Sequence, residues 1–272
     1  MKICLHAIVK NEETILERCL AAAQPFVAGY HLCDTGSSDA TLEIIENFRL
    51  RSGLPVQVEH LDFVDFQTTR NQALQLCRQW AADYDYVLLC DADMELRSDG
   101  PRTPLDQDHY LVEQRAGDFR YWNSRLVRPN TPGEYRGYTH EVFHSSRPAQ
   151  RYAGFYFFDH ADGGSRSHKF ERDERLLRRQ IEEDPKDPRA WFYLAQTLKD
   201  LGRFEEAIET YQHRINLSGW PEEIWYSRLQ QARCAQALDQ LDRAVTLYWR
   251  AYEDRPERAE SLYALARMLR SQ

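Results

Sequence analysis

The sequence contains no CxxC pair, although it has six cysteines: Cys4, Cys19, Cys33, Cys77, Cys90 and Cys234. This absence disfavours zinc ribbons and thioredoxin-type redox chemistry, which need closely spaced cysteines. Cysteines inside apolar runs, such as Cys4, Cys33 and Cys90, are commonly buried as free thiols. We therefore expect reduced core cysteines and a cytosolic protein.

The chain also lacks an apolar run of 18 residues, a signal-peptide pattern at its N-terminus and an excess of basic residues. The first two absences predict a cytoplasmic protein without a membrane span. The formal net charge of −8 argues against a duplex nucleic acid as partner, because such proteins normally present a basic face. With 272 residues, 42 % of them apolar, the chain suits a catalytic domain plus a small appendage.

The first ninety residues alternate between strand-like and helix-like segments. We expect strands at 3–9, 29–34, 55–60 and 85–90, and helices at 12–23, 38–50 and 67–82. Strands that alternate with helices predict βαβ units, and therefore an α/β fold with a mainly parallel sheet. The unbroken apolar run at 86–90 is typical of a central strand that is buried on both faces.

Beyond residue 95 the pattern changes. We expect two further strands at 108–115 and 119–127, a loop-rich stretch at 130–170, and a charged helix from 170 to 183. A loop of that length inside a domain is usually functional.

From Pro188 onward, small and aromatic residues recur at the spacing of tetratricopeptide repeats, with a plain helical bundle as the alternative. Ala207 and Ala244 are equivalent positions 37 residues apart, about three more than the usual period, and we place the extra residues in the loop at 217–221. We thus expect a catalytic domain at 1–170, a connecting helix at 171–187 and helical repeats at 188–272. Because the third repeat stops after its first helix, we expect the repeats to serve acceptor binding or a homodimer, and not the chemistry.

Polar clusters follow three of the predicted strands: Lys10–Glu12, Asp34–Asp39 and Asp91–Asp93. The carboxyl ends of parallel strands are where α/β proteins bind ligands. Residues 37–39 fit an ordinary helix cap supplied by a serine, whereas Asp34 ends an apolar strand and is expected to contact a ligand.

Asp91 and Asp93 are the most specific of these signals. Residues i and i+2 of an extended chain point to the same side, so the two carboxylates repel each other unless a cation lies between them. Oxygen ligands suit Mg²⁺ or Mn²⁺. The alternative is a solvated turn, because DxD triplets also arise by chance.

Basic and histidine residues add weaker candidates. Arg70 and Asn71 stand at the start of the third predicted helix, where an arginine can bind a phosphate or simply lie on the surface. Later in the chain, His140, Glu141 and His160 occur in a stretch rich in glycine and tyrosine, and such side chains serve as bases or metal ligands.

Lys169 and Arg172 open the charged helix. They could neutralise a diphosphate, or they could be the solvated charges of an exposed helix.

Several motifs resemble family 2 inverting glycosyltransferases of the GT-A fold: AIVKNEE, CDTGSSDAT, TTRNQAL, LLCDADMEL, YTHEVF and FDHADGG followed by K..RD. Their order and spacing match the branch with C-terminal tetratricopeptide repeats, which includes peptide S-glycosyltransferases that modify sublancin-type bacteriocins. The resemblance implies a GT-A, Rossmann-like catalytic domain, a nucleotide diphosphate sugar as donor (most simply a UDP-sugar) and a bound Mn²⁺ or Mg²⁺.

The resemblance also implies roles for single residues. Asp34 resembles the carboxylate that contacts the base or ribose, Asp93 the direct metal ligand, and His160 the histidine near the metal or diphosphate. Glu141 is our candidate for the catalytic base, because the chain has no clear ED dyad. The residues expected to contact the donor are Lys10, Asn11, Glu12, Asp34, Arg70, Asn71, Asp91, Lys169 and Arg172.

These residues predict an inverting transfer in one displacement to a peptide, protein or saccharide acceptor, in which the metal bound to Asp93 neutralises charge on the leaving diphosphate. A nucleotidyltransferase is an alternative, although the VKNEE loop lacks the glycines typical of such enzymes. The other alternative is a tetratricopeptide adaptor with a degenerate α/β domain, against which the intact Asp91 and Asp93 pair argues.

Overall fold

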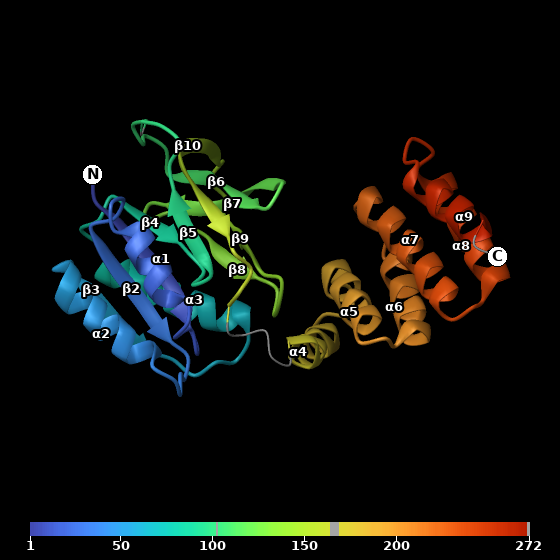
Figure 1. Cartoon of the computed structure of the whole chain (residues 1–272), viewed down its shortest axis with the longest axis horizontal. Helices are drawn as coiled ribbons and strands as arrows, with labels where there is room; N and C mark the ends of the chain where they lie inside the picture. The colour runs from blue at the N-terminus through green and yellow to red at the C-terminus, as the bar shows by residue number, and fades with distance from the viewer. Residues whose placement is uncertain (102, 164–168, 271–272) are drawn as a thin grey trace. The chain divides into compact units, whose positions relative to one another are not determined.

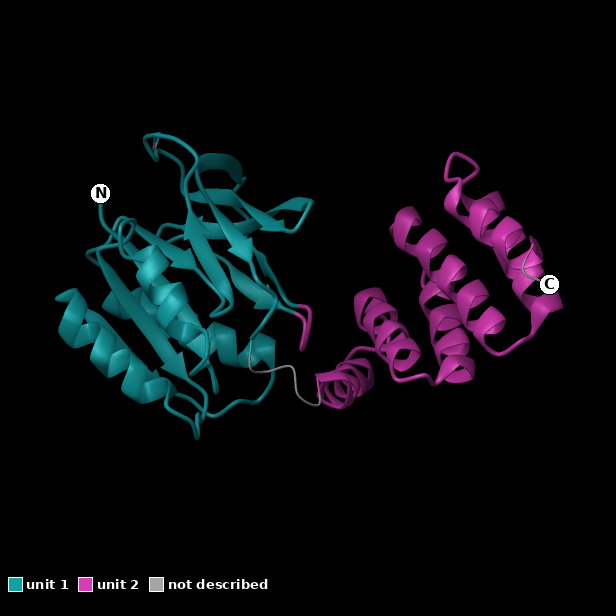
Figure 2. Ribbon diagram, in the orientation of Figure 1, with its two compact units in different colours: residues 1–136, 141–167 teal, residues 137–140, 168–272 magenta. Residues whose placement is uncertain are grey.

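A computed structural model describes residues 1–101, 103–163 and 169–270 (Figure 1). The chain forms two compact units (Figure 2). The first comprises Met1–Arg136 and Glu141–Ser167, and the second comprises Gly137–His140 and His168–Gln272. Four residues in the middle of the sequence thus belong to the unit that is otherwise C-terminal.

The first unit is built on an eight-stranded mixed sheet with the strand order β3-β2-β1-β4-β7-β6-β10-β5. Its first four strands are parallel, β7 is antiparallel to both of its neighbours, β10 is parallel to β6, and β5 is antiparallel to β10. The six predicted strands are confirmed as β1 (Ile3–Val9), β2 (Gly29–Asp34), β3 (Val56–His60), β4 (Tyr86–Leu89), β6 (His109–Ala116) and β7 (Phe119–Val127). The α/β fold class is therefore confirmed.

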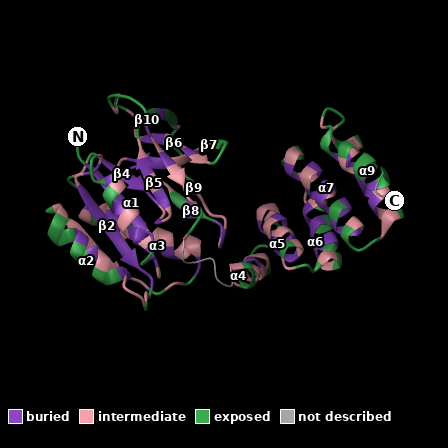
Figure 3. Ribbon diagram, in the orientation of Figure 1, coloured by how far each residue is buried: buried purple, intermediate pink, exposed green. Residues whose placement is uncertain are grey.

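Helices cover both faces of this sheet. Alternate residues of β1 enter two different clusters of buried side chains: Leu5 packs with residues of α1 (Leu16–Ala23) and α2 (Thr41–Ser52), whereas Cys4 packs with α3 (Phe66–Trp80). This is the period of two that a strand imposes. All four residues of β4 are buried, as expected of a central strand, and Figure 3 shows the buried interior of the sheet. All six cysteines are buried and free, as predicted.

The expected serine cap of α2 is wrong. The residue before the helix is Ala40, whose side chain forms no capping bond. Instead, the carboxylate of Asp39 accepts from the backbone N–H of Thr41 at 3.0 Å, and the hydroxyl of Ser37 accepts from the backbone N–H of Asn11 at 2.9 Å. The serine is used to join two loops.

The stretch at 130–170, predicted to be loop-rich, contains three strands: β8 (Glu134–Arg136), β9 (Val142–His144) and β10 (Gln150–Asp159). A fourth unpredicted strand is β5 (Met94–Arg97). β10 escapes sequence analysis because its pairing with β6 shifts register between Tyr152 and Tyr156, around Gly154, and this bulge breaks the alternation of apolar and polar residues. β8 and β9 form a separate antiparallel hairpin.

The second unit is helical. Its helices are α4 (Lys169–Glu183), α5 (Pro188–Asp200), α6 (Phe204–Asn216), α7 (Pro221–Ala237), α8 (Leu241–Asp254) and α9 (Glu260–Arg270). Small buried residues, including Ala195, Ala207, Ala232 and Ala244, let these helices approach closely. α4, which we expected to be a connecting helix, packs Leu177 into the same core.

The extra residues of the second repeat lie in a helix and not in the loop at 217–221. α7 has 17 residues, whereas its counterpart α5 has 13. The insertion adds one helical turn, which keeps the inward face in register because a turn is 3.6 residues long. No helix in the described part of the chain is both long enough and apolar enough to cross a membrane.

Candidate functional site

Two polar loops at the carboxyl edge of the sheet are tied together. The backbone N–H of Ser38 donates to the side-chain oxygen of Asn11 at 2.8 Å, and the backbone N–H of Glu12 donates to the hydroxyl of Thr41 at 2.8 Å. Asn11 adopts a positive φ of 54°, a conformation that asparagine tolerates better than most residues. These bonds shape the loop from Lys10 to Glu12 and leave Lys10 exposed.

Asp34, at the end of β2, is buried and holds its own loop. Its carboxylate accepts from the backbone N–H of Gly36 at 3.1 Å and from that of Ser37 at 3.2 Å. His60 lies 3.7 Å from the same carboxylate. The structure thus places Asp34 at the predicted edge, with a rigid orientation.

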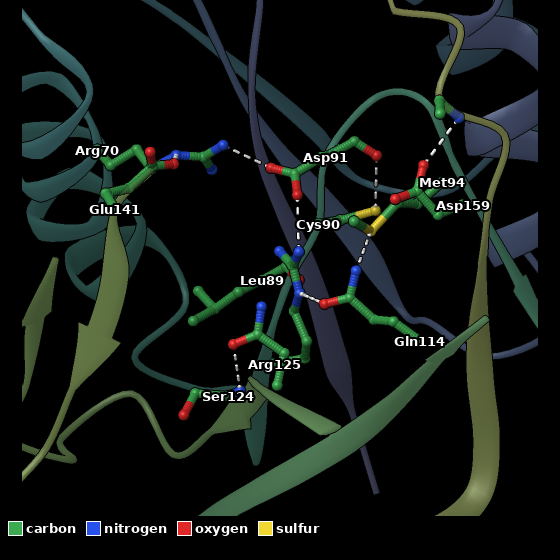
Figure 4. A network of polar contacts seen from close by, with 12 residues as sticks. Arg70, Leu89, Cys90, Asp91, Met94, Gln114, Ser124, Arg125, Glu141 and Asp159 are labelled. Carbon is green, nitrogen blue, oxygen red and sulfur yellow. Dashed lines mark hydrogen bonds and ion pairs between the residues drawn. The ribbon is translucent and has the colours of Figure 1, made fainter. Parts of the chain in front are cut away.

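Asp91 follows β4 and lies between two arginines (Figure 4). Its Oδ1 accepts from Nη2 of Arg70 at 2.5 Å, and its Oδ2 accepts from Nη2 of Arg125 at 2.8 Å. We expected the negative charges of Asp91 and Asp93 to require a cation between them. That argument fails for Asp91, because its charge is already balanced within the protein.

The electrostatics of this group follow from its burial and its ion pairs. Burial by itself would raise the pKa of Asp91, but Arg125 and Arg70 outweigh it and hold that pKa below its ordinary value. Conversely, burial would lower the pKa of Arg70, but the neighbouring Asp91 and Glu141 raise it. Asp91, Arg70 and Arg125 are therefore all charged near neutral pH.

Arg125 is a site residue that sequence analysis missed. Tyr110 of β6 pairs with Leu126 and the next residue, Leu111, pairs with Ser124, so Arg125 has no partner opposite and forms a β-bulge. A bulge redirects a side chain, and here it brings the guanidinium to Asp91, where Gln114 also accepts from its Nε at 3.1 Å. The available signal was a charged residue next to the buried pair Leu126 and Val127.

Glu141 lies beside the same network. Its Oε1 is 2.5 Å from Nε of Arg70, and only 14 % of its side chain is exposed. A carboxylate paired with a guanidinium keeps a fixed orientation. The structure thus brings Glu141, Arg70 and Asp91 together.

Asn71 has a structural role. Its side-chain N–H donates to the carbonyl of Tyr135 at 2.9 Å, and its oxygen accepts from the backbone N–H of Tyr135 at 2.8 Å. Both ends of the amide are used to attach β8 to α3. The expected contact of Asn71 with the donor stays a prediction.

Asp93 lies beside His160 at the ends of β5 and β10. The backbone N–H of His160 donates to the carbonyl of Asp93 at 3.2 Å, and Nε2 of His160 is 2.9 Å from Oε2 of Glu95. Metal-bound histidines usually hold a carboxylate with their second nitrogen, and the contact of His160 with Glu95 has this form. Gly164, part of the motif that led us to His160, lies outside the described residues.

A different group of potential ligands lies in the core. The described residues include His6, His31 and Cys77, whose ligand atoms lie within 4.8 Å of one another. Nδ1 of His31 is 3.2 Å from Nδ1 of His6, which is a normal hydrogen-bond distance. Soft nitrogen and sulfur ligands are not those that Mg²⁺ or Mn²⁺ prefers, so this group does not compete for the predicted ion.

Lys169 and Arg172 open α4 in the second unit, where Arg172 donates to the carboxylate of Asp173 at 3.0 Å. The expected contact of these two residues with a diphosphate stays a prediction.

Comparisons with known proteins match this architecture. Residues 5–100 match the model of Glycosyl transferase family 2, and residues 176–209 match a Tetratricopeptide repeat model. The chain carries a family 2 glycosyltransferase domain. The matched residues include most of β1 and all of β2 to β5, and therefore Asp34, Asp91 and Asp93.

A TPR repeat-containing protein of Synechococcus elongatus is 32 % identical over 156 residues, which cover 53 % of this chain and 36 % of that protein. The chain thus spans about a third of the curated relative's length. Among solved structures, residues 1–349 of S. aureus TarS are similar over 91 % of this chain and 90 % of that chain, with 15 % identity and a TM-score of 0.43. The N-terminal domain of stress-induced protein-1 from C. elegans covers 38 % of this chain and 85 % of its own, with 16 % identity and a TM-score of 0.36.

Proposed function

We propose that this protein is an inverting glycosyltransferase that moves a sugar from a UDP-sugar to a peptide, protein or saccharide acceptor. The main support for the proposal is that the neighbouring carboxylates Asp91 and Asp93 have different surroundings. Asp91 is neutralised by Arg70 and Arg125, whereas Asp93 lies beside a histidine that is held by Glu95. Within a family 2 domain, this arrangement supports a donor site at the carboxyl edge of the sheet.

Mn²⁺ or Mg²⁺ is the proposed cofactor, with Asp93 and His160 as its protein ligands. When bound, such an ion would stabilise the negative charge that develops on the leaving diphosphate. Asp34, whose carboxylate accepts from the backbone N–H of Gly36, is the proposed contact to the nucleoside. Glu12 and Lys10 lie in the adjoining loop as further donor contacts.

Glu141 is the proposed general base. Its contact with Arg70 orients the carboxylate, which would accept the proton of the acceptor. One displacement by the deprotonated acceptor inverts the anomeric carbon. A thiol acceptor would need less help from this base, because part of it is already ionised near neutral pH.

The proposal is tested by measuring donor hydrolysis over a panel of nucleotide sugars, with Mn²⁺ and with excess chelator. We expect hydrolysis of a UDP-sugar only when the metal is present. Hydrolysis that is unchanged in chelator would exclude the metal, and the absence of hydrolysis and of nucleotide binding would favour a non-catalytic adaptor. Release of pyrophosphate from a nucleoside triphosphate would favour the nucleotidyltransferase alternative.

A homodimer through the helical repeats and a cytoplasmic location remain proposals. Exposed aromatic and aliphatic side chains on α8 and α9 support the dimer: Trp249 is 48 % exposed, Tyr263 65 % and Leu269 56 %. Buried free thiols support a reducing compartment. Light scattering over a range of protein concentrations tests the dimer, and a monomer at every concentration would exclude it.

A further inference from the structure

A chain of hydrogen bonds runs across the sheet from Asp91 to Tyr121. Oδ2 of Asp91 accepts from Nη2 of Arg125 at 2.8 Å, and Nε of Arg125 donates to Oε1 of Gln114 at 3.1 Å (Figure 4). Nε2 of Gln114 in turn donates to the hydroxyl oxygen of Tyr121 at 3.0 Å. Gln114 is only 1 % exposed, so both ends of its amide bond to protein groups and not to water.

Arg125 fixes the direction of these bonds. A guanidinium can only donate, so the end of the Gln114 amide that faces Arg125 must be the oxygen. The other end is then the NH₂ group, and the Tyr121 hydroxyl must accept from it. In the described part of the chain, Gln114 is the hydrogen-bond partner of this hydroxyl. The proton of the Tyr121 hydroxyl is therefore left to donate to a further group.

Tyr121 lies at the same edge of the sheet as Asp91. β7 runs antiparallel to β4, with Leu126 opposite Leu88, so residues earlier in β7 lie further towards the carboxyl end of β4. Tyr121 is also 38 % exposed, although its hydroxyl is held by a buried side chain. A ligand at the carboxyl edge can therefore reach both the ring and the hydroxyl.

The charges around Tyr121 agree with this position. Burial raises the pKa of Tyr121, and the charge of Asp159 raises it further. Asp91 and Asp93 add to this effect, while Arg125 opposes it. Because such effects weaken with distance, the hydroxyl lies near Asp93, the proposed metal ligand. A raised pKa also keeps the hydroxyl protonated near neutral pH, so it remains a donor.

The strand order places the candidate contacts in a row. Asp34 ends β2, Asp93 follows β4, and Tyr121 belongs to β7. These strands lie in the order β2-β1-β4-β7, and neighbouring strands are about 4.8 Å apart. A nucleotide sugar with its nucleoside at Asp34 and its diphosphate at Asp93 therefore extends its sugar towards β7.

We propose that Tyr121 contacts the donor sugar: its hydroxyl donates a hydrogen bond to a sugar hydroxyl, and Arg125 and Gln114 set the direction of that bond. The exposed ring offers an apolar surface to the C–H groups of the same sugar. This inference rests on the proposed function and names a residue of that site that recognises the sugar. Such a contact favours donors that carry a hydroxyl at the contacted position.

The test compares the dissociation constants of two ligands by calorimetric titration with Mn²⁺. One ligand is UDP. The other is whichever of UDP-glucose, UDP-galactose and UDP-N-acetylglucosamine the wild type hydrolyses fastest. Tyr121→Phe should weaken binding of the UDP-sugar by about three- to tenfold, the share of one uncharged hydrogen bond, and should change UDP binding less than about twofold. Unchanged binding of the UDP-sugar, or an equal loss for both ligands, overturns the inference.

Gln114→Glu separates a contact with the sugar from a role in the fold. A glutamate of the same size still accepts from Arg125, but its other oxygen accepts where the amide donated. The Tyr121 hydroxyl then donates to that carboxylate, and its proton is no longer available to the sugar. We expect the affinity for the UDP-sugar, relative to that for UDP, to fall as in Tyr121→Phe. If the hydroxyl only supported the fold, the retained bond would leave this ratio unchanged, and that result overturns the inference.

Tyr110→Phe provides the matched control. Tyr110 lies near the start of β6, the strand that also carries Gln114, and its hydroxyl donates to Asp106 at 2.9 Å. The variant loses the same hydroxyl group away from the carboxyl edge, and both affinities should stay as in the wild type. An equal loss of UDP-sugar affinity in Tyr110→Phe would overturn the specific role of Tyr121. A wild type that hydrolyses none of the three UDP-sugars contradicts the proposed function itself, and the inference fails with it.

Discussion

Replacing Asp91 with asparagine removes the negative charge that bridges Arg70 and Arg125, while the side chain keeps its size. The exposed fractions are 13 % for Arg70, 9 % for Arg125 and 24 % for Asp91. Removing one partner of a buried ion pair costs about 3–5 kcal/mol, because an unpaired buried charge remains. We expect the lower end, about 3 kcal/mol, since Asp91 is partly hydrated and Arg70 retains Glu141.

For a domain of this size, such a loss lowers the melting temperature by about 6–12 °C. Calorimetry in excess chelator measures it without any contribution from a bound metal. Asp93→Asn is the matched control, two residues away, and should melt within about 2 °C of the wild type, as expected for a loss below about 1 kcal/mol. The double variant Asp91→Asn with Arg125→Met should be more stable than Asp91→Asn alone, because it removes one of the stranded charges.

The reasoning is refuted if Asp91→Asn melts like the wild type in chelator. It is also refuted if Asp93→Asn is the less stable of the two single variants. Either result would mean that Asp91 does not have a structural role distinct from the ligand-binding role of Asp93.

Three further outcomes are expected. Asp93→Ala should abolish metal-dependent turnover while the fold survives, and unchanged turnover in Mn²⁺ would exclude this residue as the ligand. A uridine diphosphate nucleotide should raise the melting temperature only with Mn²⁺ or Mg²⁺, and Asp34→Ala should abolish the shift. An equal shift in chelator would contradict a metal-bridged site. A shift with guanosine nucleotides alone would contradict the choice of uridine as the base. Burial lowers the pKa of His140 to about 4, and the nearby Asp173 offsets only part of this effect. As the pH falls below about 6.5, His140 therefore takes up a proton in the unfolded chain before it does so in the folded chain. The free energy of unfolding should accordingly decrease as the pH drops from about 6.5 towards 4. Unfolding titrations at several pH values should show a shallower fall in His140→Phe, and identical slopes would contradict the assignment.

Local patterns in the sequence were enough to determine the order of strands and helices in the first ninety residues and the helical character of the C-terminal unit. A strand or helix that is buried on one face has apolar residues at intervals of 2 or 3.6 residues, and this spacing can be read from the sequence of that element alone. The position of Asp34, Asp91 and Asp93 followed as well, because parallel strands end at one edge of a sheet.

Only the tertiary structure decided which partner each of these side chains meets. Arg125 reaches Asp91 through a bulge in β7, and Asn71 turns to the backbone of Tyr135, 64 residues away in sequence. Glu141 meets Arg70 of α3, which lies far from it in sequence. Such pairings depend on register, bulges and the meeting of distant segments, and a residue's own neighbours in sequence carry no record of them.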